Sequence, residues 1–237
     1  MTYLSRQRNL FLLMALATIC CGFLVMIRIC WQRYQLPDIN TFREFVQARG
    51  LTFFFLLWNL ALAWVPYLMA LHIGQLQRQE AGRWRLLLGL CVWLAFLPNA
   101  PYLITDFVHF RPLPPVPIWF DLILLFAAAS TGLLLGLLSI YEVHQVLKNW
   151  FSKRYSNLLI LAAIGLSGFG IWLGRFQRWN SWDILTRPLD LLSDIADTFT
   201  TRHELLHALG ISGLLSGVLL MGYGILTTLM SGQTSRK

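Results

Sequence analysis

The sequence predicts an all-α integral membrane protein, a polytopic bundle of six transmembrane helices with one further amphipathic helix at the extracytoplasmic surface. Of the 237 residues, 57% are hydrophobic and only 13% are charged. Six apolar runs are long enough to cross a hydrocarbon core of roughly 30 Å. A bilayer offers no water to their backbone groups, so these runs should be helices. We therefore expect residues 1–237 to form a single membrane domain.

The predicted spans follow the apolar runs in order: 10–29, 51–73, 86–107, 118–141, 157–174 and 206–230. Two arginines precede the first run, as in a signal peptide. No small-x-small cleavage site follows it, so we expect an uncleaved anchor. The four cysteines lie in or beside spans and indicate neither a disulfide framework nor a zinc cluster. The sequence leaves any cofactor unknown.

Charged residues orient the predicted bundle. The acids gather in or beside the connections on one side: Asp38, Glu44, Asp106, Asp121, Asp183, Asp190, Asp194, Asp197 and Glu204. Short basic segments, including both tails, lie on the other side, which the positive-inside tendency makes cytoplasmic. We therefore expect both termini in the cytoplasm.

The net charge of +8 does not indicate a nucleic acid partner, because the basic residues form no continuous tract. Membrane lipids are the expected partners. The sequence specifies neither a protein partner nor an oligomeric state.

Two amides are expected inside the membrane. Asn59 and Asn99 lie about eight residues, roughly 12 Å, from the same end of their spans, so they should sit at similar depth. In hydrocarbon each needs a partner, which predicts that both face the bundle interior. A packing hydrogen bond between helices and a contact to a substrate both fit this pattern.

The third span should be interrupted. Two prolines three residues apart, at 98 and 101, disfavour a continuous helix, and Asn99 could cap a new segment. Beyond the break, four polar residues recur within roughly 80° of one helical face: Asn99, Tyr102, Asp106 and His109. A stiff proline-rich return then leads to Asp121 at the start of the fourth span. Asp106, His109 and Asp121 are the catalytic candidates, for acid–base chemistry or divalent cation binding. Alternatively, these acids form ion pairs with arginines and have a structural role.

The connection after the fifth span is the second candidate site. Arg175 and Arg178 lie one helical turn apart, and arginine suits bidentate capture of carboxylate or phosphate. The substrate-binding candidates are therefore Asn59, Asn99, Tyr102, Arg175, Arg178 and Asp183. Helix capping by Asn180 and Asp183, with tryptophan anchoring at the interface, explains this segment without a ligand.

An amphipathic helix should follow on the same side. Its apolar residues recur at helical spacing: Leu185, Leu189, Leu192, Ala196 and Phe199. Asp190, Asp194 and Asp197 lie on the opposite side. Small residues at four-residue spacing predict close helix packing at Ala128, Gly132 and Gly136, at Gly170 and Gly174, and at Gly213 and Gly217.

The segment His203–His207 matches the H-E-x-x-H pattern, in which two histidines bind zinc and Glu204 acts as the base. No Asp, Glu or His follows His207, so the downstream third ligand is missing. We expect no metal site here, and a membrane zinc metalloprotease is the alternative. An interfacial helix start explains the same residues.

Several motifs resemble the DUF1361 family of multi-pass prokaryotic membrane proteins: Trp58-Asn59, residues 64–67, residues 96–102, Thr105-Asp106, residues 119–121 and residues 174–183. The resemblance covers about residues 51–185, does not reach the H-E-x-x-H segment and implies no activity. It implies a prokaryotic cytoplasmic membrane. Two classes of function stay open. The first is an enzyme that acts on a lipid or lipid-linked anionic substrate. The second is a non-catalytic transporter or assembly protein.

Overall fold

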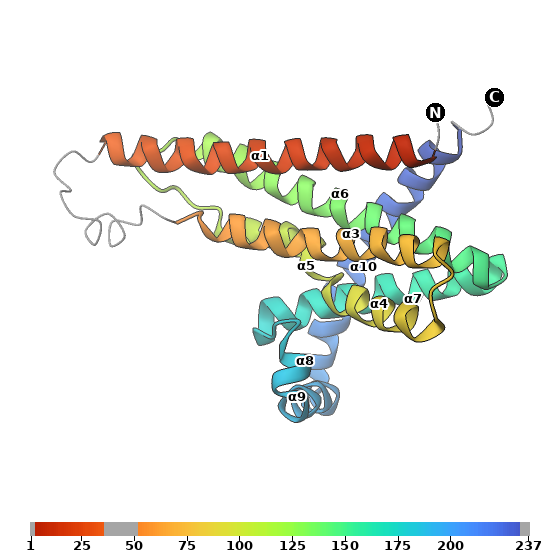
Figure 1. Cartoon of the computed structure of the whole chain (residues 1–237). Coiled ribbons are helices and arrows are strands. Elements are labelled where there is room, and N and C mark those ends of the chain that lie inside the picture. Colours follow the sequence, from red (N-terminus) through yellow and green to blue (C-terminus); the bar gives the residue numbers. More distant parts are fainter. Residues whose placement is uncertain (1–2, 36–51, 233–237) are drawn as a thin grey trace.

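The structure is a computed structural model that describes residues 3–35 and 52–232 (Figure 1). Leu51, Asp38, Glu44 and the C-terminal tail, which the sequence predictions include, lie outside the described residues. Within these residues the chain forms helices and no strand. Their bounds are α1 (Tyr3–Gln35), α3 (Phe55–Arg78), α4 (Arg83–Phe96), α5 (Asn99–Tyr102), η1 (Leu103–His109), α6 (Ile118–Trp150), α7 (Lys153–Trp172), η2 (Leu173–Gln177), α8 (Asp183–Thr186), α9 (Pro188–Thr200) and α10 (Arg202–Gly232).

Six helical segments are long and apolar enough to cross a membrane, which confirms the predicted all-α polytopic class. The helices are longer than the predicted spans. α6, for example, continues to Trp150, past the predicted end at 141. Apolar composition reports only the part that lies in hydrocarbon, whereas backbone hydrogen bonds carry a helix on into the polar interface.

The long helix α6 forms the centre of the bundle. In its most apolar window 67% of the residues are buried, against 11–39% in the other spans. Its buried face includes Leu124, Leu135 and Ile140, around which the two apolar core clusters assemble. The described ends of α1 and α10, Tyr3 and Gly232, lie at the same end of the bundle (Figure 1). The low buried fractions of the outer helices mean that most of their apolar side chains face away from the protein.

The third span is interrupted, as the prolines predicted. α4 ends at Phe96, the short helix α5 follows from Asn99, and the chain continues as the 3₁₀ helix η1. The expected capping role of Asn99 is wrong. Its side-chain nitrogen donates to the carbonyl of Phe96 at 3.0 Å. The amide therefore satisfies the end of α4 instead of the start of the next segment.

Glycines hold α5 between α6 and α7. A Cβ on Gly132 would lie 2.5 Å from the carbonyl oxygen of Ala100, and one on Gly170 would lie 2.5 Å from Cγ of Pro98. Both distances are far below van der Waals contact. The absence of a side chain on each flank is therefore what admits the broken segment into the bundle, as small residues do in other membrane helix interfaces.

The third predicted small-residue pair does not pack closely. A Cβ on Gly213 or Gly217 would meet no atom within 4 Å outside its own helical turn in the described part of the chain. Both glycines lie on the exposed side of α10. Four-residue spacing records which residues share a helix face, but it does not say whether that face meets another helix.

The helix α9 runs across the direction of the long helices and is seen nearly end-on in Figure 1. It is amphipathic, as predicted. The apolar side chains of Leu189, Leu192 and Phe199 are exposed. Leu191 and Ile195, at the edge of the same apolar arc, turn instead toward the bundle and line a pocket described below. The aspartates occupy the opposite arc.

Candidate functional site

Arg175 is the centre of a polar cluster between the third and fifth spans. Its Nε donates to Oγ1 of Thr105 at 2.8 Å, and one terminal nitrogen donates to a carboxylate oxygen of Asp106. The other terminal nitrogen lies 3.3 Å from Nε2 of His109. The guanidinium also stacks on the ring of Tyr102, 4.3 Å from its centroid. Each of the three guanidinium nitrogens and one face of the group therefore have a protein partner.

Irregular helix geometry brings these groups together. Arg175 lies in η2, a short π-helical turn, and Thr105, Asp106 and His109 lie in the 3₁₀ helix η1. In a 3₁₀ helix residues three apart lie above one another, which aligns Asp106 with His109. π-helical turns are frequent at functional sites.

The carboxylate of Asp106 is fully buried, with 1% of the residue exposed. Besides Arg175 it accepts a hydrogen bond of 2.9 Å from the side-chain nitrogen of Asn59 on α3. A charge inside a membrane bundle is stable when it is paired and hydrogen-bonded. Asp106 and Arg175 meet this condition together, so the pair carries no net charge and ties α3, η1 and η2 into one unit.

The predicted stripe on the third span is divided between two places. Tyr102, Asp106 and His109 surround Arg175, whereas Asn99 donates to Oγ of Ser181 at 2.8 Å. Asn99 and Tyr102 lie in the same short helix α5, so the contact with Ser181 separates Asn99 from the stripe. The change to 3₁₀ winding after Tyr102 alters the spacing only of Asp106 and His109. Thr105 is a member of the cluster that the helical spacing did not predict.

Asp121, the third catalytic candidate, has a different partner. Its carboxylate accepts a hydrogen bond of 3.1 Å from Nε of Arg28 on α1. Arg28 also donates to Gln32 and lies over the ring of Phe53. No hydrogen bond or ion pair links Asp121 with Asp106 among the described residues. Asp106 and Asp121 thus have separate arginine partners, and the Arg28–Asp121 ion pair joins α1 to α6.

Arg178 and Asp183 do not join the Arg175 cluster. Arg178 is exposed and has a left-handed backbone (φ 62°), at the turn that ends η2. Asp183 is buried and accepts hydrogen bonds from the backbone N–H of Asn180 at 2.8 Å and from the hydroxyl of Thr186 at 3.2 Å. These bonds order the turn from residue 179 to 187, although α8 itself begins after Trp182 with no side-chain capping hydrogen bond.

A pH prediction follows for this turn. The backbone N–H of Asn180, with weaker help from its amide, Thr186 and Arg187, holds the pKa of Asp183 below its ordinary value. A depressed carboxyl pKa stabilises the folded turn above the ordinary pKa, and the stabilisation is lost as the pH falls through the depressed value. The hydrogen-exchange protection factors of residues 179–187, which compare each rate with that of an unstructured amide at the same pH, should therefore fall in acid. Asp183→Asn should lower this protection already at pH 7 and remove its pH dependence. An unchanged profile in the variant would contradict this role.

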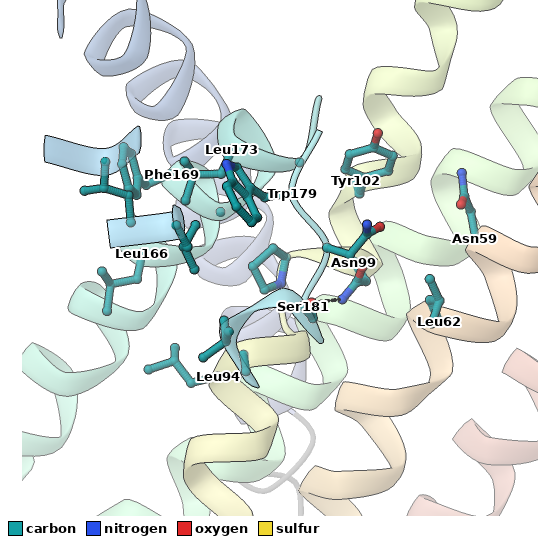
Figure 2. Close-up of a pocket in the computed structure, with 18 of the residues that line it drawn as sticks. Asn59, Leu62, Leu94, Asn99, Tyr102, Leu166, Phe169, Leu173, Trp179 and Ser181 are labelled. Atoms are coloured by element: carbon teal, nitrogen blue, oxygen red, sulfur yellow. Dashed lines mark hydrogen bonds between the residues drawn. The ribbon is translucent and has the colours of Figure 1, made fainter. Parts of the chain in front are cut away.

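A pocket of about 610 Å³ opens beside the cluster, between α3, α4 and α5 on one wall and α7 and α9 on the other. Figure 2 shows Asn59, Asn99 and Tyr102 on the first wall and Leu166, Phe169 and Leu173 on the second. The segment 179–181 closes one side, where Ser181 meets Asn99. Three of the predicted binding residues thus line one pocket, whereas Arg175, Arg178 and Asp183 do not.

The H-E-x-x-H segment begins α10. His203 is exposed, and Nδ1 of His207 accepts a hydrogen bond of 3.2 Å from the indole of Trp172. The His207 ring also packs edge-on against Phe176, with centroids 4.9 Å apart. In the described ranges, no three His, Cys, Asp or Glu side chains form a group that could hold a metal ion. His207 therefore has an aromatic packing role.

Fold and site together define a six-span α-helical membrane protein with a pocket beside its interrupted third span. The chain belongs to the family described as Protein of unknown function (DUF1361), whose model matches residues 58–218. The match confirms the family resemblance. It also corrects its extent, since it reaches beyond residue 185 and includes the H-E-x-x-H segment. No curated protein and no solved structure matches the chain.

Proposed function

We propose that the protein binds a lipid or lipid-linked molecule of the membrane in the pocket between α5 and α7. The observation that carries the proposal is the chemistry of the pocket walls. Amide and hydroxyl groups gather on the side of α3, α5 and the 179–181 segment, and hydrocarbon side chains cover the side of α7 and α9 (Figure 2). A ligand that is polar at one end and apolar along its length fits both.

The rim of the pocket supports a ligand that enters from the bilayer. Three large apolar residues that line it are also exposed: Trp58 by 60%, Leu166 by 54% and Ile184 by 45%. Trp58 and Leu166 lie on candidate membrane spans, where exposed apolar side chains face lipid tails. A lipid can therefore move sideways into the pocket without leaving an apolar surrounding, whereas a water-soluble solute would have to cross it.

Within this proposal the Arg175 cluster positions the pocket wall. Thr105, Asp106 and His109 all contact Arg175, which stacks on Tyr102, and Tyr102 lines the pocket. Asp106 and His109 thus hold groups in place. A reaction on the bound lipid would need acid–base groups that reach the pocket itself, so binding is the function that this geometry favours over catalysis.

We further propose that the protein lies in a prokaryotic cytoplasmic membrane, with both termini in the cytoplasm and the pocket in the outer half. The basic connections at the end where α1 begins, and the acids at the other end, support this orientation. The exposed leucines of α9 would then lie in the outer interface.

Topology reporters test the orientation. A reporter fused after Lys237 should be active in the cytoplasm, and one inserted near Asp194 should be active outside. A reporter in the 79–82 connection provides an internal control, because it should agree with the C-terminal fusion. Opposite signals at Lys237 and Asp194 would reverse the orientation and place the pocket in the inner half.

Filling the pocket tests lipid binding. Ala95 lines the pocket, so Ala95→Trp should place an indole where the ligand lies and abolish lipid retention after detergent purification. Ala162 on the exposed face of α7 offers the matched control, and Ala162→Trp should retain lipid as the wild type does. Native mass spectrometry measures the retained lipid, and thermal unfolding confirms that each variant folds. Equal retention by a folded Ala95→Trp protein would refute the proposed site.

A further inference from the structure

The pocket has an unusual balance of hydrogen-bonding groups, which points to the chemistry of the lipid head. Three asparagines line it, and each directs its amide nitrogen at another part of the protein. Asn59 donates to the carboxylate of Asp106, Asn99 to the carbonyl of Phe96, and Asn180 to the carboxylate of Asp183. Carboxylates and carbonyls only accept hydrogen bonds, so these partners fix which way each amide points.

The oxygens of the same three side-chain amides are the groups that can accept hydrogen bonds from a ligand. Among the described residues, the side-chain oxygens of Asn59, Asn99 and Asn180 accept no hydrogen bond. Tyr102 and Ser181 also line the pocket, and each carries a hydroxyl that can donate. The polar side of the pocket therefore presents three acceptors and two hydroxyls. This set complements a ligand head rich in hydroxyl groups, since a hydroxyl both donates and accepts.

The charge of the pocket lining narrows the class of lipid head that fits. No Asp, Glu, Lys, Arg or His side chain is among the described residues that line the pocket. The nearby guanidinium of Arg175 is already neutralised by Asp106, and Arg178 lies outside the lining. A phosphate in this pocket would meet no free cation, and an ammonium would meet no free anion. Either charge would stay uncompensated beside hydrocarbon, which is strongly unfavourable.

We propose that the pocket selects an uncharged lipid head that carries hydroxyl groups, as in a diacylglycerol or a glycosyl diacylglycerol. This inference rests on the proposed lipid binding and replaces the anionic head that the arginines suggested from the sequence. The Asn59, Asn99 and Asn180 oxygens accept hydrogen bonds from the head, and the acyl chains lie along Leu166 and Phe169.

The test uses matched lipids and the full chain. Purified protein in mixed micelles receives equal amounts of dioleoylglycerol and dioleoyl phosphatidic acid, which differ only in the phosphate, and native mass spectrometry compares the bound species. We expect dioleoylglycerol to be retained at least about tenfold more. A monohexosyl dioleoylglycerol, added in a second mixture, distinguishes a sugar head from a single hydroxyl. A preference for phosphatidic acid, or no preference, overturns the inference.

Two mild variants connect the preference to the named groups. Asn180→Ala removes one acceptor and leaves the backbone N–H bond to Asp183, and Tyr102→Phe removes one hydroxyl and leaves the ring under Arg175. Each should lower retention of the hydroxylated lipid about fivefold, the effect of one lost hydrogen bond. Unchanged retention in both folded variants contradicts the assignment. One outcome separates the two proposals. If the wild type retains an anionic lipid and Ala95→Trp loses it, the inference about the head group is refuted, whereas the proposed binding site is supported.

Discussion

Asp106→Ala is expected to lower the free energy of unfolding by about 3–5 kcal/mol, the cost of leaving a buried charge without its partner. Arg175 keeps its contacts to Thr105 and Tyr102 in the variant but loses its counter-charge, and Asn59 loses its acceptor. Because the pair joins three segments of the bundle, the loss should also loosen the wall of the pocket. Reversible unfolding by SDS in mixed micelles measures the effect.

A second variant separates charge from packing. Asp106→Leu combined with Arg175→Met removes both charges, and exchange of a buried pair for apolar groups is often nearly neutral. The double variant should therefore recover much of the stability that Asp106→Ala loses. Asp197→Ala, at an exposed acid of α9, serves as the control and should change little. A double variant as unstable as the single one would mean that Asp106 acts through packing alone.

Gly132→Ala is the second substitution with a large expected effect. The new methyl group would lie 2.5 Å from the carbonyl oxygen of Ala100, and that backbone is held from the other side by Gly170 against Pro98. The segment cannot move away, so we expect a destabilisation of about 1–3 kcal/mol, as for other overpacked cores. The same unfolding titration measures it.

Gly213→Ala gives the matched comparison. Its methyl group meets no atom within 4 Å outside its own helical turn in the described chain. Alanine favours a helix over glycine by up to about 1 kcal/mol, so this variant should be neutral or slightly more stable. Equal effects of Gly132→Ala and Gly213→Ala would show that α5 is not held by the glycines of α6.

The spans and the break in the third span were predictable because each depends on local composition. Apolar length identifies a membrane helix, and prolines at 98 and 101 interrupt one wherever they occur. The pairing of Asp183 with Asn180 was also predictable from local sequence, because the two residues lie only three positions apart.

The partners of the buried charges were not all predictable. Asp106 and Arg175 were both named, but the pairing of Asp121 with Arg28 joins residues 93 positions apart and depends on where α1 docks. Asn99 donates to Ser181, 82 positions further along the chain, and so does not join the cluster around Arg175. Long-range docking and local changes in winding leave no periodic signal, and they decide which polar groups share a site.

A cryo-electron microscopy map of the protein in nanodiscs made with lipids of its own membrane tests the central claim most directly. The structure predicts an elongated density that enters past Leu166 and ends at the amide oxygens of Asn59 and Asn99. Helices at the described positions with no such density between α5 and α7, or a pocket closed by its own side chains, would contradict lipid binding.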